Sequence, residues 1–469
     1  MPTRRELLNG SVLTLAGLSM GCAAGGSVSS AKRVPSVIGD LQERTFRFFW
    51  DTTDPETGLA PDRWPTPSFC SIAAVGFALT AYPVGVVNGW ITRAQALKRT
   101  LATLEFLASA PQGPQVSGVI GHKGFFYHFL DMKTGHRFGT TELSTIDTTL
   151  LLGGALFAQS WFDRDHPGER RIRALADQLY AAVDWAWIRP RAPLISMGWS
   201  PESGFIPHDW NQYNESLLLY LLAIGSPTHA VPPATWAAWS ARFDAVWDAK
   251  GPRPHLRFPP LFGHQYSHVW VDFRGIRDPY MRAKGIDYFE NSRRATLAQR
   301  DYAIANPGQF AGYGPNIWGL TACDGPGDFI LETGGRTREY FSYSARGPGD
   351  RDDGTIAPTA AASSIAFAPE ISTPAIEEMR ARYGLGLYQK YGFLDSFNPT
   401  LTDTATPLKH GKIVPGIGWV AGDYLGIDQG PIIAGIENWR TGMIWATMRK
   451  NPHIRRGLER AGFTGGWLG

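Results

Sequence analysis

The 469-residue sequence has few cysteines and no strong excess of charge of either sign. Apart from Cys22 it contains only Cys70 and Cys323, so one disulfide is allowed in an oxidising compartment, but nothing in the sequence demands it. The 45 basic and 42 acidic residues are spread along the chain, for a formal net charge of +3. Because no basic stripe follows a nucleic-acid backbone, we expect no nucleic-acid partner.

Motifs of several enzyme classes are also missing. There is no Gly-x-Ser-x-Gly nucleophile elbow and no glycine-rich phosphate loop. His264 and His268 are four residues apart, but no glutamate follows the first, as a zinc protease would need. The stretches "DPETG" and "DRDDG" lack the spacing of a calcium loop, and no uronate-type basic cluster favours a polysaccharide lyase. We therefore expect no metal and no cofactor.

The first residues have the pattern of a twin-arginine export signal, which directs a protein to the periplasm. Arg4 and Arg5 precede a moderately apolar stretch, Val12–Met20, which is too short for a lasting membrane span, and small residues follow. The stretch "LSMGC" before Cys22 resembles a lipoprotein processing site, except that the leucine stands four residues before the cysteine instead of three. A lipid-anchored product and an unmodified periplasmic or secreted product both remain open.

The remaining sequence is typical of a large globular protein rich in helices, with 43% hydrophobic and 19% charged residues. Apolar periodicity predicts twelve helices: Val37–Trp50, Ser71–Val84, Thr92–Leu107, Ser144–Gln159, Glu169–Trp187, Asn214–Ile224, Ala234–Trp247, Tyr288–Ala305, Pro358–Phe367, Pro374–Tyr383, Pro431–Arg449 and Pro452–Ala461. Several consecutive pairs combine one helix that is apolar on nearly every face with one that is amphipathic and charged. Two concentric rings of helices require this alternation.

We therefore predict an all-α fold, the six-fold double-helix toroid (α/α)6. Residues 118–139 alternate aromatic and polar side chains around a Lys-Thr-Gly turn, which predicts a small β-hairpin at one mouth of the barrel. Residues 251–277 and 307–357 are predicted as long loops that build a cleft. Residues 1–32 are assigned to the export signal and linker, and residues 33–469 to a single domain, which we expect to be a monomer.

Glu215 is the first candidate for a functional residue, because it stands where the polar stretch "WNQYNE" meets the apolar run Leu217–Ile224. Asn211 or Asn214 is predicted to cap a buried helix whose first turn contains Glu215. Two interpretations are open. An anion at a helix N-terminus gains about 0.3 to 1 kcal/mol from the helix dipole, a purely structural role. The alternative is a catalytic carboxylate at the floor of a pocket.

Other carboxylates also lie near predicted helix starts. Ser144 and Asp147 form a plausible capping box, and Glu142 lies just outside it, free to face a pocket. Asp428 is predicted to cap the helix that Pro431 opens. Two further acids have structural alternatives: Glu437, for which an ion pair with Arg440 is expected, and Asp353, a loop cap or a pocket acid.

Glycoside hydrolysis needs two carboxyl groups, one protonated and one ionised. A barrel whose inner helices start at one mouth can supply both. Since a helix N-terminus favours the anion, Glu215 as an acid needs a pKa raised by desolvation or by a neighbouring carboxylate, for which Glu142 is the natural candidate.

Ten segments, in order from about Leu41 to Phe463, resemble the glucoamylase-like family of bacterial (α/α)6 glycosidases that contains the endo-β-1,2-glucanases, glycoside hydrolase family 144. They are "LQERTFRFFWDTTDPETGLAPDR", "SIAAVGFALTAYPVG", "GFFYHFLDMKTG", "ELSTIDTTLLLGGAL", "NESLLLYLLAIGSPTH", "PPLFGHQYSHVWVDFRGIRD", "NIWGLTACDGP", "DGTIAPTAAASSIAFAPE", "YGFLDSFNPT" and "YLGIDQGPIIAGIENWRTG". As a set the segments are specific for the family, although no single one is specific for the substrate.

The resemblance implies an exported hydrolase of β-linked glucans, most typically β-1,2-glucan, with an inverting acid/base mechanism. It places the pocket acids at Glu142, Asp147 and Glu215. Glu215 is expected to be the general acid, with Glu142 positioning water or tuning that proton. The base could instead be Asp147, acting through a chain of water molecules.

Sugar-binding residues are predicted among aromatic and polar side chains, each with core packing or a loop ion pair as the alternative. The candidates are Trp210, Tyr266, His268, Trp270, Arg274, Trp318, Asp324 and Trp439. Rival hypotheses are an exo-acting glycosidase, a transglycosylase, a glycosidase of another periplasmic glycan and a non-catalytic glycan-binding lipoprotein.

Overall fold

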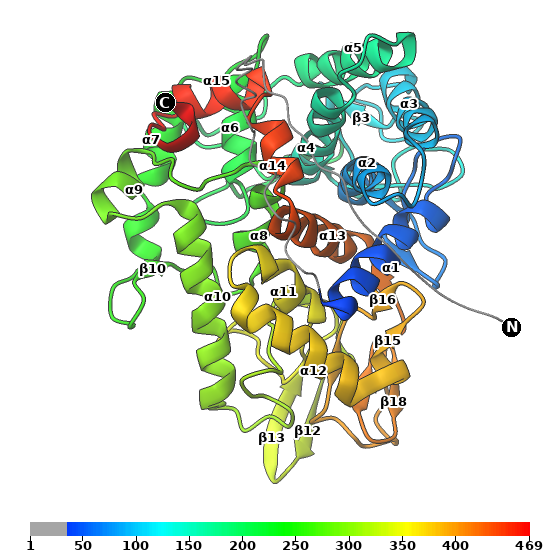
Figure 1. Ribbon diagram of the computed structural model, residues 1–469, viewed down its shortest axis with the longest axis vertical. Helices are drawn as coiled ribbons and strands as arrows, with labels where there is room; N and C mark the ends of the chain where they lie inside the picture. The colour runs from blue at the N-terminus through cyan, green and yellow to red at the C-terminus, as the bar shows by residue number, and fades with distance from the viewer. Residues whose placement is uncertain (1–34) are drawn as a thin grey trace, which may run out of the picture. The chain divides into compact units, whose positions relative to one another are not determined.

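The computed structural model describes residues 35–469, in which helices dominate and strands are short (Figure 1). The predicted export signal, Cys22 and the linker lie outside the described residues. Residues 35–469 belong to one compact unit.

The helices are α1 (Ser36–Thr52), α2 (Ile72–Val87), α3 (Arg93–Ser109), α4 (Thr145–Trp161), α5 (Pro167–Ala182), α6 (Leu217–Gly225), α7 (Ala234–Ser240), α8 (Phe262–Trp270), α9 (Pro279–Lys284), α10 (Tyr288–Ala305), α11 (Pro358–Ser363), α12 (Pro369–Leu387), α13 (Gly426–Arg440), α14 (Met443–Met448) and α15 (Pro452–Arg460).

The strands form small antiparallel sheets in the connections between helices. Several of them immediately precede a buried helix, as β2 precedes α2, β6 precedes α4 and β20 precedes α13. The pairs are β1 (Arg63–Trp64) with β20 (Tyr424–Leu425), β2 (Cys70–Ser71) with β5 (Phe129–Leu130), β3 (Gly121–His122) with β4 (Phe125–Phe126), β9 (Trp247–Asp248) with β10 (His255–Leu256), β11 (Ala322–Cys323) with β14 (Ser344–Ala345), β12 (Phe329–Thr333) with β13 (Arg336–Tyr340) and β15 (Tyr388–Gln389) with β16 (Gly392–Phe393). Two three-stranded sheets join β6 (Leu143–Ser144), β7 (Gly198–Ser200) and β8 (Gly204–Phe205), and β17 (Phe397–Asn398), β19 (Gly418–Val420) and β18 (Lys412–Val414).

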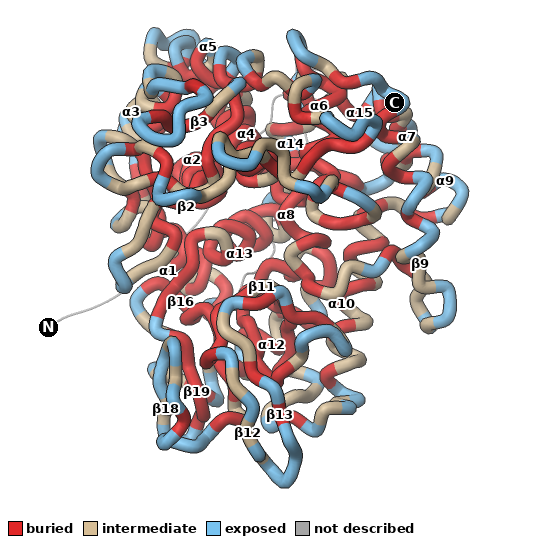
Figure 2. Tube along the Cα trace, turned by 180° about the vertical axis from the view of Figure 1, so that it is seen from behind, coloured by how far each residue is buried: buried red, intermediate tan, exposed pale blue. Residues whose placement is uncertain are grey.

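The helices divide into a buried set and a half-exposed set, as the sequence predicts. Nearly every residue of α2, α4, α6, α11 and α13 is buried, whereas α1, α3, α5, α10 and α12 keep one exposed face (Figure 2). A helix without an exposed face needs neighbours all round it. The buried set therefore lies inside the half-exposed set.

Helices α2 and α4 approach each other unusually closely, and two glycines allow it. A Cβ atom on Gly154 would lie 2.0 Å from the carbonyl oxygen of Gly76, and a Cβ on Gly76 would lie 2.3 Å from that of Leu150. Helix α2 also packs on α13, and α13 packs on α11 and α8. Helices α2 and α4 are thereby held together by direct packing of backbone on backbone.

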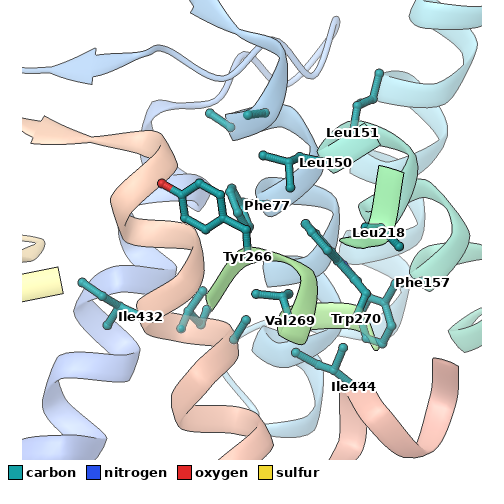
Figure 3. Packing of buried hydrophobic residues seen from close by; sticks show 14 of the residues in the cluster. Phe77, Leu150, Leu151, Phe157, Leu218, Tyr266, Val269, Trp270, Ile432 and Ile444 are labelled. Atoms are coloured by element: carbon teal, nitrogen blue, oxygen red, sulfur yellow. The ribbon is translucent and has the colours of Figure 1, made fainter. Parts of the chain in front are cut away.

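The centre of the protein is an apolar cluster into which side chains from several of these helices converge (Figure 3). Phe77 of α2 stacks on Trp270 of α8, with ring centroids 5.3 Å apart, and Ile432 of α13 lies in the same cluster. Tyr266 differs from its labelled neighbours because its hydroxyl points away from the apolar side chains (Figure 3). The fully packed cluster fixes the helices whose first residues form the site described below.

Each of the twelve predicted helices has a helical counterpart, but the prediction that residues 251–277 form only a loop is wrong, because they contain α8. Its sequence, "FGHQYSHVW", is buried although it is rich in polar residues. Its glutamine finds hydrogen-bond partners on another part of the chain: Gln265 donates to the carbonyl oxygen of Ala360 and to Ser364. Single-sequence periodicity misses such a helix because its partners come from distant segments.

Other boundaries also differ from the sequence expectations. The predicted helix Pro431–Arg449 is two helices, α13 and α14, separated at Gly442, whose φ of 68° interrupts the helix. Because α13 already begins at Gly426, Asp428 lies inside the first turn and does not cap a helix opened by Pro431. The predicted hairpin over residues 118–139 contains the β3–β4 pair, while β5 leaves it to pair with β2.

Candidate active site

Carboxyl groups gather at the beginnings of the buried helices. Asp147 is the third residue of α4 and Asp428 the third residue of α13, while Glu142 and Glu215 shortly precede α4 and α6. The unpaired N–H groups of a first helical turn favour negative charge. This arrangement concentrates acids at the ends of several helices that are packed together.

The sequence predicts that Glu215 lies in the first turn of a helix. This prediction is wrong, because Glu215 lies two residues before the first residue of α6. The side chain of Asn214 accepts hydrogen bonds from the backbone N–H and hydroxyl of Ser216. Ser267 of α8 donates to the carbonyl oxygen of Glu215 at 2.8 Å and accepts from the N–H of Leu218 at 3.0 Å. The backbone around Glu215 is thus fixed from two sides.

The carboxyl group of Glu215 has the environment of a proton donor. Its Oε2 atom is buried and has no hydrogen-bond partner within the described residues 35–469. Burial raises the pKa of Glu215 to about 7, and the nearby negative charge of Asp147 adds to the rise. A carboxyl with this pKa is largely protonated below neutral pH and can transfer its proton there.

Glu142 has the opposite protonation preference because it contacts His128. Nδ1 of His128 lies 2.8 Å from Oε1 of Glu142, and its Nε2 lies 3.6 Å from Oδ2 of Asp147. Burial alone would raise the pKa of Glu142, but the hydrogen bond and positive charge of His128 hold it below its ordinary value. Ser144 caps α4 by accepting from the N–H of Asp147, and its hydroxyl donates to that carboxylate. Glu142 is therefore ionised where Glu215 is protonated.

A second group of acids lies at the start of α13. Burial, with the charge of Asp324, raises the pKa of Asp395 to about 7, and burial, with the charge of Asp395, raises the pKa of Asp428 well above its ordinary value. The two carboxyls affect each other's protonation, as the members of a carboxyl pair that shares a proton do. Arg63 donates to Asp324 at 2.9 Å, and the N–H of Asp324 donates to Asp395 at 2.7 Å.

Tyr266 of α8 lies between the two groups of acids. Burial raises the pKa of its hydroxyl well above the ordinary value, and the charges of Asp428, Glu215 and Asp147 act in the same direction. These three carboxyls therefore share one neighbourhood around Tyr266, although they come from α4, from α13 and from the segment that precedes α6. Of the predicted sugar-binding residues, Tyr266 and Asp324 are the two that the structure brings to the acids.

Three of the predicted tryptophan platforms lie in the packed interior. The indole N–H of Trp210 donates to Thr145 at 2.8 Å, at the start of α4, and that of Trp270 donates to Thr80 at 3.0 Å. Trp318 is 1% exposed. Trp210 is nearest to the acids through its contact with Thr145, while Trp270 fills the central apolar cluster.

The remaining predicted residues, His268, Arg274 and Trp439, lie away from the helix beginnings that carry the acids. His268 is enclosed by aromatic rings and hydrogen-bonds to Ser292, and burial lowers its pKa to about 3. Arg274 pairs with Asp272 at 2.8 Å. Trp439 follows Asp428 by eleven residues on α13, which places it about 16 Å further along the helix axis. The structure does not bring these three residues to the acids.

The two acids with structural alternatives have structural partners. Asp353 forms a fully buried ion pair with Arg346 at 2.9 Å and accepts from the N–H of Thr355, as a loop cap does. Glu437 lies 3.9 Å from Arg440 and accepts hydrogen bonds from other side chains, which are Gln42, Asn88 and Thr441. Neither acid belongs to the group around Tyr266.

Sequence reasoning missed His128 and Asp395, and it gave Asp428 only a capping role. A signal for Asp428 exists, because Asp147 and Asp428 hold the same position in two helices that each follow a two-residue strand. His128 and Asp395 lie in irregular segments whose neighbours are fixed only by the tertiary fold. Nothing in their local sequence distinguishes them from other polar loop residues.

The described part of the chain contains no group of three or more His, Cys, Asp or Glu side chains that could hold a metal ion. Cys70 and Cys323 are buried free thiols. Within residues 35–469, no helix has the length and apolar character needed to cross a bilayer.

A mostly helical protein that gathers carboxyl groups of contrasting pKa at the starts of its buried helices has the layout of a helical glycosidase. A family model described as "Putative glucoamylase" matches residues 207–452, more than half of the chain. A solved structure of a putative glucoamylase from Bacteroides uniformis is 32% identical and covers 93% of this chain and 100% of its own, with a TM-score of 0.79. The chain belongs to this glucoamylase family.

Two further relatives have names that refer to β-1,2-linked glucans. The endo-β-1,2-glucanase of Chitinophaga pinensis, solved with sophorotriose and glucose, is 29% identical, with a TM-score of 0.75, and covers 92% of this chain and 99% of its own. An exo β-1,2-glucooligosaccharide sophorohydrolase of Parabacteroides distasonis is 28% identical over 453 residues, 90% of this chain. The chain spans 57% of the length of that curated relative. The resemblance predicted from the sequence is confirmed.

Proposed function

We propose that this protein is a glycoside hydrolase that cleaves β-1,2-linked glucan, with Glu215 as the general acid. The observation that carries the proposal is the contrast between two carboxyls near one another in the fold: Glu215, with a pKa raised to about 7, and Glu142, with a pKa held below its ordinary value. Glycoside hydrolysis requires one protonated and one ionised carboxyl. The names of the relatives supply the linkage.

In the proposed reaction, Glu215 donates its proton to the glycosidic oxygen as the bond to the anomeric carbon breaks. A water molecule gives up a proton to an ionised carboxylate and attacks the anomeric carbon from the opposite face, so that the configuration inverts. Glu142, or Asp147 through further water, is the proposed base. The base then releases its proton to solvent and Glu215 takes up a proton from solvent, which completes the cycle.

The Asp395–Asp428 pair offers a second source of the base. Two carboxyls that share one proton carry one negative charge, and Asp428 of this pair acts on Tyr266, as Glu215 and Asp147 do. Separate substitutions distinguish the two sources, because Glu142→Gln and Asp395→Asn each remove one of them. The variant that loses turnover while retaining substrate binding identifies the base.

The finer architecture we propose is the (α/α)6 toroid. Its inner ring would consist of α2, α4, α6, α8, α11 and α13, and its outer ring of α1, α3, α5, α7, α10 and α12. The packing of α2 on α4 and α13, of α4 on α6 and of α13 on α11 supports this order. Helix α8 supplies the sixth inner member, with Tyr266 facing the acids.

We also propose that the protein is exported through its twin-arginine signal and acts as a monomer in the periplasm. A lipid attached to Cys22 would anchor the protein to the membrane in the same compartment. The polysaccharide substrate would be reached there directly. Labelling of the expressed protein with a fatty-acid analogue, compared with Cys22→Ser, tests the anchor.

Product analysis by chromatography tests the substrate and the mode of attack. Linear and cyclic β-1,2-glucan should be incubated with the mature protein beside β-1,3-, β-1,4- and β-1,6-glucans and starch. A ladder of short β-1,2-oligosaccharides from linear β-1,2-glucan alone is the expected endo result. Release of sophorose alone would replace the endo mode by the exo mode of the sophorohydrolase relative. No cleavage of β-1,2-glucan would refute the proposal, and glycan binding without cleavage would favour a non-catalytic binding protein.

Two variants test the role of Glu215. Glu215→Gln keeps the shape of the side chain but cannot donate the proton, so turnover should be lost while the fold is retained. Glu437→Gln is the control, because Glu437 is a glutamate of the protein interior that lies in the network around Gln42 and Asn88. If Glu215→Gln retained activity, the assignment of Glu215 as the general acid would be refuted.

A further inference from the structure

His128 lies between two carboxylates of the candidate site and uses one ring nitrogen for each. Nδ1 is 2.8 Å from Glu142, and Nε2 is 3.6 Å from Asp147. The ring is not part of the apolar core, since its side chain is 29% exposed, and the side chain of Glu142 is 36% exposed. A ring in this place can act on both acids at once and is still reached by solvent.

The position of the ring is fixed independently of the two carboxylates. The N–H of His128 donates to the carbonyl oxygen of Glu142 at 2.9 Å, and its own carbonyl oxygen accepts from the N–H of Ile72 at 3.2 Å. The imidazole stacks on the ring of Phe129, with centroids 3.9 Å apart and planes 23° apart. His128 thus joins the start of α2 to the start of α4, and its orientation does not depend on a flexible side chain.

The charges around His128 are mostly negative. Glu142 and Asp147 approach from the α4 side, and Asp62 acts from the loop that precedes β1. The positive groups that act on those acids have carboxylate partners of their own: Arg137 acts on Glu142 but pairs with Glu202, and Arg63 pairs with Asp62 and Asp324. Three acids therefore favour the imidazolium form.

We propose that His128 is a positioning residue of the hydrolase, a permanent imidazolium that keeps Glu142 ionised and orients it beside Asp147. This inference rests on the proposed function, because it assigns His128 a task in that reaction. His128 itself touches no reacting atom. It acts through Glu142, which the reaction needs in its charged form.

The electrostatics give the expected direction of every pH effect. Burial by itself lowers the pKa of His128, but the charges of Asp147 and Glu142 and the hydrogen bond to Glu142 outweigh it and raise the pKa to about 9. Without the imidazolium, the burial of Glu142 is no longer offset, and its pKa rises above the ordinary value. The acidic limb of the activity profile, where Glu142 takes up a proton, should therefore move to higher pH. The alkaline limb, set by Glu215, should stay in place.

An NMR titration of the histidine side chains tests the charge of His128 without any turnover. His128 is expected to keep its protonated ring shifts through pH 8, and the signal is identified by its loss in His128→Gln. His122 of the neighbouring β3 is the internal comparison, since burial lowers its pKa and it should be neutral at pH 7.5. A His128 signal that titrates below pH 7 would overturn the inference.

The kinetic test compares the pH dependence of kcat and KM in the wild type, His128→Gln and the control His122→Gln. Glutamine keeps a hydrogen-bond donor but removes the charge. In His128→Gln the acidic limb of the kcat–pH profile should move to higher pH by about one unit, and KM at the pH optimum should change little. His122→Gln should leave both limbs unmoved, because His122 packs on Trp187 and Trp199 and pairs with no carboxylate in the described structure.

The outcomes separate this inference from the proposed function. If the wild type turns over β-1,2-glucan and Glu215→Gln does not, the proposed function stands. An acidic limb that is then unchanged in His128→Gln would overturn the role of His128 alone. A uniform loss of activity at every pH, with a lower melting temperature, would make His128 a structural residue and would also overturn the inference. No turnover by the wild type would refute the proposed function and the role of His128 with it.

Discussion

Replacing Glu215 by glutamine should make the protein more stable at alkaline pH while it abolishes turnover. In the folded protein the pKa of Glu215 is raised from an ordinary 4.5 to about 7, chiefly by burial. Unfolding returns the group to its ordinary pKa, so the folded state binds the proton more tightly than the unfolded state does. The stabilisation linked to this proton is complete below pH 4.5 and is lost as the pH rises through 7. Glutamine is neutral throughout and shows no such loss.

The size of the effect follows from the same two values. Each pH unit between the folded and unfolded pKa corresponds to about 1.4 kcal/mol, so the upper limit is about 3 kcal/mol. Because Glu215 is only partly buried, solvent screening reduces the expected gain to about 1–2 kcal/mol. For a protein of this size that is about 1–2 °C in Tm.

Thermal melts of the wild type and Glu215→Gln at pH 4.5 and pH 8.5 measure this difference directly. The variant should gain stability relative to the wild type at pH 8.5 but not at pH 4.5. Glu437→Gln, in which the lost carboxylate has hydrogen-bond partners, should show no gain at alkaline pH. A shift of Tm that is the same at both pH values would refute the argument that Glu215 carries a raised pKa.

Three further predictions concern packing, a buried ion pair and the second carboxyl. Gly154→Ala should lower the free energy of unfolding, measured by chemical denaturation, by about 1–3 kcal/mol, because the added Cβ would overlap the backbone of α2. The control Gly39→Ala on α1 has open space around the added Cβ, so it should be neutral or stabilising by up to about 1 kcal/mol. Arg346→Met should destabilise the protein by about 3–5 kcal/mol, since it leaves the buried charge of Asp353 without its partner, and a melting temperature equal to that of the wild type would contradict this. Glu142→Gln should reduce kcat by about 10²- to 10⁴-fold with substrate binding retained in calorimetry, and unchanged kcat would move the base to another carboxylate.

Helix α6 and helix α8 show how much of the fold could be predicted from the sequence. The run Leu217–Ile224 has only apolar side chains, so its burial follows from the residues themselves. Helix α8 is equally buried, but its histidines, glutamine and serine find partners on α6 and the segment before it, on α10, and on α11 and the turn after it. No local pattern reveals such partners, so the sequence predicted a loop there.

The candidate site divides in the same way. Glu142 and Glu215 could be predicted because each stands next to an apolar helical run, where a charge needs a reason, and because family resemblance favoured catalysis. The structure adds what spacing cannot give: the imidazole of His128 on Glu142, and the pairing of Asp395 with Asp428 from segments more than thirty residues apart. The predicted tryptophan sites relied on residue type alone, and the structure places most of them in packed interior positions.

The central claim is that Glu215 donates a proton in the hydrolysis of β-1,2-glucan. The most direct measurement is ¹H NMR of linear β-1,2-glucan during incubation with the wild type and with Glu215→Gln at pH 6. With the wild type, new reducing ends should appear first as the α-anomer, as inversion requires, and Glu215→Gln should produce none. New reducing ends produced equally by both proteins, or by neither, would contradict the claim.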